Sequence, residues 1–279
     1  MNEYLADLKN SIAKFNPPDL VNDFEYAQIV KNVRVALMAG GESSRFKEVS
    51  SGNVNKSAFL LPNGDTMIEM AIRMYRDSGI INFVVLAYHN SQSIIDILGD
   101  GSKLGVNIKY SFDPEKPVGK GGAVKNALLS KSILDHETLI VHNPDDVIVN
   151  FSNDFPKYIL SGHIQGLKAN RIATVVVVPE TTYPYTGMQV LDNCVETIEM
   201  YPMIPIPTHI GVTIFDPKCY YMFNDVFDLN VKTDFESVLF PILSKNKSLH
   251  AVSIPFNNWI PVNNLKSYKQ LLNTLNISY

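Results

Sequence analysis

Two glycine-containing stretches and one acidic turn hold the residues whose types and spacing could do chemistry. The first stretch is Gly40-Gly41-Glu42-Ser43-Ser44-Arg45, and Lys56 is a further cation along the chain. Glycines let backbone N–H groups approach phosphate oxygens without a Cβ in the way, while Ser44 and Arg45 add hydrogen-bond donors and positive charge. The stretch is therefore a candidate phosphate site. An ordinary glycine turn with a solvated Arg is the alternative interpretation.

The second stretch, Gly119-Lys120-Gly121-Gly122, follows a proline-rich loop and should open a helix that begins near Gly122 and runs to about Ile133. Its small residues would let a base or a ribose lie against the backbone, with Lys120 close to a phosphate. A flexible helix cap is the alternative. The stretch lacks the third glycine of the dinucleotide-binding fingerprint, and Lys56-Ser57 lacks the glycines of a Walker A loop.

The acidic turn is Asn143-Pro144-Asp145-Asp146, which comes directly after an apolar run. A carboxylate at the end of a buried strand can hold a hard cation while phosphate oxygens complete the coordination shell. Asp145 is thus a candidate ligand of Mg²⁺. Asn and Asp also satisfy the backbone of plain turns, which is the competing explanation.

Several other functions find no support in the sequence. The six histidines form no HxH or HExxH arrangement, and no GxSxG elbow is present, so neither a zinc site nor a hydrolytic triad is indicated. The net charge is only −4 with no block of Lys or Arg, which argues against a nucleic-acid partner. Apolar runs are shorter than the ~18 residues that span a bilayer, and the first residues show no secretory signal. We expect a soluble, cytoplasmic protein in which Cys194 and Cys219 are reduced and buried.

From Val33 onward, short β-rich runs alternate with helical patterns, which predicts an α/β fold with a mainly parallel sheet flanked by helices. The expected strands are residues 33–38, 83–87, 107–112, 138–142, 173–178 and 209–215. Expected helices begin near Met67, at Ser91 as N-cap, near Gly122, at Phe235 and at Tyr268. Ligands of open α/β sheets gather at the carboxyl ends of the strands, where both the first glycine loop and the acidic turn should lie.

Residues 1–32 differ from this pattern. Leu5, Leu8, Ile12 and Phe15 predict an amphipathic helix that ends at Pro17-Pro18. We interpret residues 1–32 as an N-terminal helical extension for docking or dimerisation, and residues 33–279 as a single domain, since 279 residues with 46% hydrophobic content can bury one sizeable core.

In order and spacing, these motifs resemble the sugar-phosphate nucleotidyltransferase family, also called nucleotide-sugar pyrophosphorylases. The family's opening Gly-Gly-x-Gly-Thr-Arg and later Lys match residues 40–45 and Lys56. Its Pro-x-Gly-x-x-Gly-Ala matches residues 117–123, and its metal-binding Asn-Gly-Asp matches residues 143–145. Weaker similarity continues through Gly187, Gly211 and Asp234-Phe235-Glu236, so that the resemblance spans roughly residues 33–270.

The resemblance implies a Rossmann-like fold of the GT-A type that joins a nucleoside triphosphate to a sugar 1-phosphate, releases pyrophosphate and uses Mg²⁺. It implies that Arg45, Lys56 and Asp145 are catalytic and that Asp145 and Asn263 hold the metal ion. The nucleotide would contact the backbone of residues 40–44 and 119–122, and the sugar would lie near Gly187 and Gly211. A homo-oligomer is compatible with the family.

Two departures from the family pattern keep alternatives open. Met200-Tyr201-Pro202 replaces the Glu-Lys-Pro whose Lys holds the sugar phosphate, and Trp259-Ile260-Pro261 replaces a Trp-x-Asp metal ligand, for which Asn263 could substitute. A regulatory subunit that binds nucleotide sugar without turning it over is one alternative. A nucleotidyltransferase with a non-sugar acceptor is another, because residues 39–45 also resemble the molybdenum-cofactor guanylyltransferases. The sugar and the base are not specified by the sequence.

Overall fold

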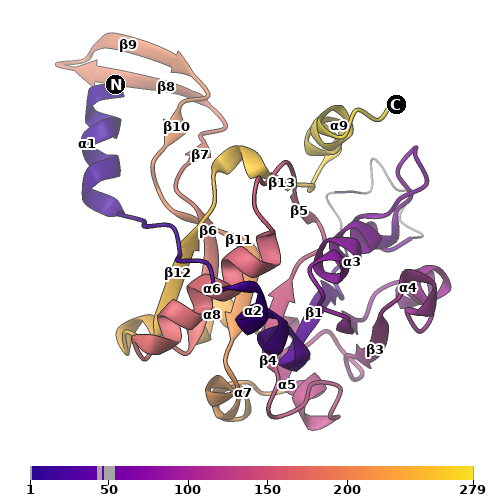
Figure 1. Cartoon of the computed structure of the whole chain (residues 1–279). Helices are drawn as coiled ribbons and strands as arrows, with labels where there is room; N and C mark the ends of the chain where they lie inside the picture. Colours follow the sequence, from indigo (N-terminus) through magenta and orange to yellow (C-terminus); the bar gives the residue numbers. More distant parts are fainter. Residues whose placement is uncertain (1, 43–45, 47–53, 279) are drawn as a thin grey trace.

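Apolar strands form one seven-stranded sheet at the centre of the protein (Figure 1). A computed structural model describes residues 2–42, 46 and 54–278. The strands lie in the order β12 (Leu249–Ser253), β6 (Ala173–Val178), β11 (Thr208–Phe215), β4 (Thr138–His142), β1 (Val33–Ala39), β2 (Asn82–Ala87) and β3 (Asn107–Phe112). Only β11 is antiparallel to its neighbours in this sheet. The predicted α/β class with a mainly parallel sheet is confirmed.

Helices cover both faces of the sheet because its strands are apolar on both sides. In β1, Val35 and Leu37 point to one buried cluster and Ala36 to the other. The first cluster is completed by α2 (Asp23–Ile29), α3 (Met67–Asp77), α4 (Ser91–Leu98) and α6 (Phe155–Lys168). The second is completed by α5 (Gly119–Leu129), α7 (Tyr220–Val226) and α8 (Phe235–Lys245). None of the described helices has the length and apolar content needed to cross a bilayer.

Smaller elements extend from the carboxyl edge of the sheet. A third cluster joins β5 (Asp146–Ile148) and β13 (Trp259–Pro261) to α9 (Leu265–Thr274). The strands β7 (Thr181–Thr182) and β10 (Met203–Ile204) pair at the base of a projecting hairpin, β8 (Thr186–Leu191) and β9 (Cys194–Met200) (Figure 1). Short 3-10 turns complete the described elements: η1 (Val30–Asn32), η3 (Lys56–Ala58), η4 (Ser102–Leu104), η5 (Pro217–Cys219) and η6 (Phe256–Asn258).

The amino-terminal region has two parts. Helix α1 (Asn2–Ile12) ends earlier than predicted, so Phe15 lies beyond it, and Lys9 forms an ion pair with Glu180 at 2.9 Å. In α2, by contrast, Tyr26 is buried in the first cluster of the main core. Residues 21–32 thus pack against the sheet domain, whereas the described buried clusters contain no residue of α1. The division of the chain at residue 32 stays a prediction.

Three strands have the predicted bounds, residues 107–112, 138–142 and 173–178. Other predictions were wrong. Ser91 is the first residue of α4 rather than its cap, because Asn90 takes the left-handed conformation before it (φ 50°). Cys194 is exposed on the hairpin, whereas Cys219 is buried, and both are free thiols. The hairpin itself and helix α6 were not predicted.

Arg34 of β1 and Glu137, the residue before β4, form a buried, bidentate ion pair. Arg34 Nε and Nη2 donate to the two carboxylate oxygens at 2.6 and 2.7 Å, and each side chain is 6% exposed. Glu137→Gln keeps the shape of the side chain but leaves the Arg34 charge without its counterion. We expect the free energy of unfolding, measured with urea, to fall by about 3 to 5 kcal/mol.

The matched control is Asp135→Asn, which breaks the exposed pair between Lys131 and Asp135 in the adjacent turn. An exposed i,i+4 pair contributes only about 0.3 to 0.5 kcal/mol. Equal losses in the two variants would show that burial gives the Arg34–Glu137 pair no special weight.

His163 predicts a pH dependence of stability. Burial, and secondarily the neighbouring His250, lower the pKa of His163 to about 3. The unfolded chain takes up a proton near pH 6.5 and the folded protein does not, so stability is complete above pH 6.5 and is lost as the pH falls toward 3. One such group contributes a slope of up to about 1.4 kcal/mol per pH unit.

His163→Gln should therefore flatten the curve of unfolding free energy against pH between pH 6 and pH 4, whatever its effect on stability at pH 7. Thr174→Val is the control, because it removes the hydrogen bond between Thr174 Oγ1 and His163 Nδ1 (2.9 Å) and keeps the imidazole. A curve as steep in His163→Gln as in the control would contradict the assignment.

Candidate active site

A cavity of about 370 Å³ opens at the carboxyl edge of the sheet. Residues at or just after the carboxyl ends of β1, β2, β3 and β4 line it, because these four strands are parallel and all end at this edge. Lys232, Asp234 and Asn263 from the second half of the chain complete the described lining. The size and position are typical of a small-molecule site in an α/β fold.

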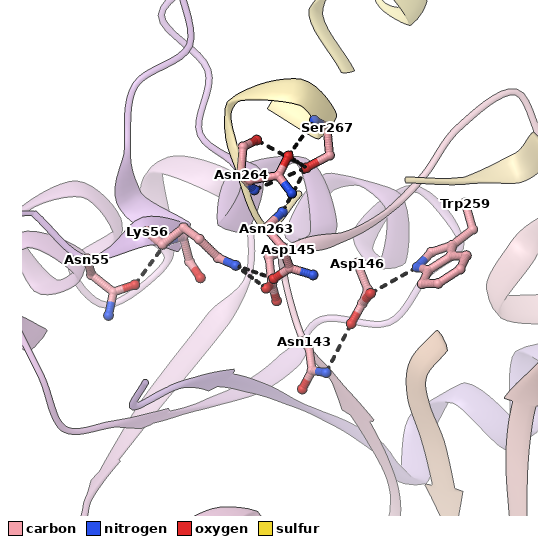
Figure 2. A network of polar contacts seen from close by, with 10 residues as sticks. Asn55, Lys56, Asn143, Asp145, Asp146, Trp259, Asn263, Asn264 and Ser267 are labelled. Atoms are coloured by element: carbon pink, nitrogen blue, oxygen red, sulfur yellow. Dashed lines mark hydrogen bonds and ion pairs between the residues drawn. The ribbon is translucent and has the colours of Figure 1, made fainter. Parts of the chain in front are cut away.

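Three side chains from distant segments meet at one end of this cavity (Figure 2). The ammonium group of Lys56 donates to Asp145 Oδ2, in close contact, and to Asn263 Oδ1 at 3.1 Å. The side chains of Lys56 and Asp145 are 10% and 23% exposed. A nearly buried cation thus lies where one carboxylate and one amide oxygen converge.

Asn55 fixes the backbone that carries Lys56. Its side-chain amide donates to the carbonyl oxygens of Ala39, the last residue of β1, at 2.8 Å, and of His89, just after β2, at 3.0 Å. Its oxygen accepts the N–H of Ser57 at 3.0 Å and opens the turn η3. Asn55 therefore ties the strand ends to Lys56, a role that its sequence context did not reveal.

Hydrogen bonds of their backbone groups hold Asp145 and Asn263 in place. The carbonyl oxygen of Asp145 accepts the N–H of Val262 at 2.8 Å, which joins the acidic turn to the segment after β13. The N–H of Asn263 donates to Ser267 Oγ at 2.9 Å, and Asn264 caps helix α9. Asp145 and Asn263 are therefore positioned by hydrogen bonds to Val262 and Ser267, which do not line the cavity.

Asp146 points away from Lys56 and is fully engaged in the framework (Figure 2). Its carboxylate accepts Trp259 Nε1–H at 2.9 Å and Asn143 Nδ2–H at 3.0 Å. Burial, and secondarily the charge of Asp145, raise the pKa of Asp146 to about 7. Trp259 thus supports the acidic turn, two residues before Pro261, which replaces the Asp of the Trp-x-Asp pattern.

His142, the last residue of β4, is neutral at physiological pH because burial lowers its pKa to about 4. Its Nε2 lies 2.9 Å from the carbonyl oxygen of Asp146, which can only accept, so the proton is on Nε2. Nδ1 then accepts the Tyr75 hydroxyl at 3.0 Å. His142 is a structural support for the turn and lies behind the cavity.

The second glycine stretch starts α5 three residues before the predicted start. The N–H groups of Lys120 and Gly121 donate to Asp234 Oδ1 at 2.8 Å and to the Thr233 carbonyl oxygen at 3.1 Å. Gly119 and Lys120 line the cavity, and Lys120 forms an ion pair with Glu236. Gly121 and Gly122 do not line it: a Cβ on either would collide with Phe227 or Val118, so packing explains these glycines.

Only some of the other predicted site residues line the cavity. Gly40, Gly41 and Glu42 line the cavity, while Ser43, Ser44 and Arg45 lie outside the described residues. Gly187 lies in β8 and is not part of the lining. Gly211 is also not part of the lining and lies directly against the acidic turn, where a Cβ would be 2.0 Å from Asp146 Oδ2.

The cavity also contains residues that the sequence did not bring forward, above all Asp113 and Lys232. Asp113 directly follows the predicted strand 107–112, as Gly40 and Asn143 follow theirs. Its place at a strand end was the available signal. Lys232 comes from a loop before α8 and carried no local signal.

The donor set at Lys56 fits a hard divalent ion. Among the described residues no group of three His, Cys, Asp or Glu side chains converges. However, Asp145 Oδ2 and Asn263 Oδ1 already meet at one cationic centre, the Lys56 ammonium. Mg²⁺ is commonly held by one or two protein oxygens together with substrate phosphates and water, which is the kind of site that these two oxygens can form.

Comparison with known proteins supports this architecture. A model of the nucleotidyl transferase family matches residues 34–276. Three solved structures are similar to this chain. The first is a protein from Bacillus anthracis provisionally assigned as a glucose-1-phosphate thymidylyltransferase, in complex with a sucrose. The second is HddC from Yersinia pseudotuberculosis, and the third is a UDP-glucose pyrophosphorylase complexed with UDP-glucose. Their sequence identities are 16%, 22% and 14%, and their TM-scores are 0.63, 0.62 and 0.62. The matches cover 88%, 87% and 88% of this chain and 97%, 99% and 98% of the others, so the fold is shared over nearly the whole length.

Gly211 allows a test of how tightly the acidic turn is packed. The residue has φ +72° and its Cα faces Asp146 and Asn143. Gly211→Ala combines left-handed backbone strain of about 1 to 2 kcal/mol with a steric clash of about 1 to 3 kcal/mol. We expect the urea unfolding free energy to fall by the sum of both.

Gly64→Ala is the matched control, because Gly64 has φ +85° and a Cβ there would meet nothing within 4 Å. The unfolding free energy of this variant should fall only by the part that comes from left-handed backbone strain. If Gly64→Ala and Gly211→Ala lose the same stability, the close approach of Gly211 to the turn has no energetic weight.

Proposed function

This chain belongs to the nucleotidyl transferase family, and from that premise we propose that it joins a nucleoside triphosphate to a sugar 1-phosphate and releases pyrophosphate. The observation that carries the proposal is the meeting of Lys56, Asp145 and Asn263 at one end of the cavity. Neighbouring structures of the same fold include one that binds UDP-glucose, which favours a sugar nucleotide as product.

The cavity has the two ends that a nucleotide requires. Around Met38, Leu86 and Ala123 the lining is apolar and suits a base. Around Lys56 it is polar and charged, and Gly40 and Gly41 also line the cavity. A triphosphate seated in this direction would place its phosphates at the Lys56 ammonium and the first glycine loop.

In the proposed reaction an oxygen of the sugar phosphate attacks the α-phosphorus in line and pyrophosphate leaves. The protein has to align two anions that repel each other and to neutralise charge on the leaving oxygens. Lys56 supplies one cation for this purpose, and we propose Arg45 as a second. When bound to Asp145 and Asn263, Mg²⁺ would supply Lewis-acid stabilisation of that charge.

The family uses a Lys to bind the phosphate of the sugar 1-phosphate, and this chain has Tyr201 at that position. A different cation lies beside Tyr201. Lys266 Nζ is 5.3 Å from the centroid of the Tyr201 ring, at the first turn of α9 and three residues after Asn263. Lys266 thus lies on the helix whose cap directly follows the proposed metal ligand Asn263. We propose that Lys266 supplies the positive charge that Tyr201 cannot supply to the sugar phosphate.

A panel assay tests the proposed activity. Hexose 1-phosphates are crossed with the common nucleoside triphosphates in the presence of Mg²⁺, and pyrophosphate release is measured. Asp145→Asn keeps the side-chain shape and an acceptor for Lys56 but removes the negative charge. We expect its rate to fall at least about 100-fold, because a metal clamp contributes several kcal/mol to the transition state.

Asp135→Asn, on an exposed turn, is the control and should keep full activity. If no pairing releases pyrophosphate while nucleotide sugar still binds, the protein is a nucleotide-sugar-binding regulatory subunit and the proposed activity is wrong. Pyrophosphate release that needs no sugar 1-phosphate, but another acceptor, would reject the sugar and retain the nucleotidyl transfer.

A further inference from the structure

One carboxylate faces the otherwise apolar end of the cavity. Asp113 follows β3 and lies beside the end of β2, where Met38 and Leu86 are neighbours on β1 and β2 and pack in one cluster with Ala123; all four residues line the cavity, as does Pro117. A charged group among such neighbours carries a desolvation cost, and burial raises the pKa of Asp113 above its usual value. A ligand that donates hydrogen bonds to the carboxylate would offset this cost.

Asp113 is held in place before any ligand binds. Its N–H donates to the Ala87 carbonyl oxygen at 3.1 Å, which fixes the backbone beside the end of β2. Its Oδ2 accepts the N–H of Val118 at 3.1 Å, just before α5 begins. Within the described part of the chain, no Lys or Arg forms an ion pair with Asp113. The carboxylate is therefore pre-positioned and retains acceptor capacity.

The chemistry of a carboxylate discriminates between bases. It can only accept hydrogen bonds, and its two oxygens suit two adjacent donors. The pairing edge of guanine presents such a pair, N1–H beside the N2 amino group. Uracil and thymine present a single N–H between two carbonyl oxygens, which a carboxylate repels. Adenine and cytosine present an amino group beside an unprotonated ring nitrogen, so one of the two contacts is lost.

Resting on the proposed function, we infer that Asp113 reads the base and that the nucleoside triphosphate of this protein is GTP. The apolar neighbours contact the faces of the purine, and Asp113 accepts hydrogen bonds from its edge. Selectivity arises as much from rejection as from attraction, because a uracil at this place would face the carboxylate with its carbonyl oxygens.

Binding of triphosphates to the full-length protein, measured by calorimetry with Mg²⁺ and without sugar phosphate, tests the inference separately from turnover. Wild-type protein should bind GTP at least about 10-fold more tightly than ATP, CTP or UTP, since a bidentate base contact gives discrimination of this order. ITP, which lacks the N2 amino group, should bind about 10-fold more weakly than GTP.

Asp113→Asn makes the test sharper. An Asn side chain presents one acceptor and one donor, which matches xanthine, where a carbonyl oxygen replaces the N2 amino group. The variant should lose about 10- to 100-fold in GTP affinity and gain affinity for XTP. Asp100→Asn is the control, because Asp100 also accepts a backbone N–H, from Ser102 at 3.0 Å, but does not line the cavity.

The outcomes separate this inference from the proposed function. If wild-type protein binds UTP as tightly as GTP, the inference is wrong. It is also wrong if Asp113→Asn loses affinity equally for all four triphosphates, which would place the carboxylate at the ribose. Pyrophosphate release with UTP alone would keep the activity and overturn the inference. A switch from GTP to XTP without pyrophosphate release from any sugar 1-phosphate would support the role of Asp113 and overturn the activity.

Discussion

The parallel arrangement of β3, β2, β1 and β4 is the constraint on which the site depends. Because the four strands run in one direction, their carboxyl ends bring Asp113, Leu86, Gly40 and Asn143 to one edge of the sheet. Residues separated by more than 100 positions thereby line one cavity. The antiparallel strand β11 enters from the same edge, and this is why Gly211 meets the acidic turn near its start. A glycine is needed there because the side chains of Asn143 and Asp146 fill the space.

The polar end of the cavity is organised in two layers. Lys56, Asp145 and Asn263 face the cavity, and each is oriented by residues behind it: Asn55 for Lys56, the Val262 N–H for Asp145 and Ser267 for Asn263. The two neighbouring aspartates consequently have different tasks. Asp145 has an oxygen directed at a cation, whereas both oxygens of Asp146 are bound by Trp259 and Asn143. This division explains why the loss of an Asp at Pro261 is compatible with an intact acidic turn.

The sequence predicted what depends on local pattern. Strands such as 138–142 and 173–178 consist of β-branched and apolar residues buried on both faces, and their bounds agree with the structure. Helix α6 was missed because Gly162 and Gly166 lower its helical propensity, and their reason lies in β12, where Val252 and His250 occupy the space that side chains would need. The start of α5 was misplaced because its cap comes from Thr233 and Asp234, more than 100 residues away. Asp113 follows a predicted strand, but the sequence did not give the strand order that brings it to the same cavity as Asp145.

Charge balance in the cavity couples the proposed ligands to each other. The described lining contains four carboxylates, of Glu42, Asp113, Asp145 and Asp234, and three ammonium groups, of Lys56, Lys120 and Lys232. Lys120 is already paired with Glu236, and Lys56 with Asp145. A triphosphate that entered alone would therefore meet little uncompensated positive charge, and several carboxylates would repel it. If Asp145 and Asn263 held a divalent ion as proposed, its charge would offset that of the carboxylates, and the Lys56 ammonium would be free to meet the phosphates. Nucleotide and ion are thus expected to bind together, with Lys56 exchanging a carboxylate partner for a phosphate one.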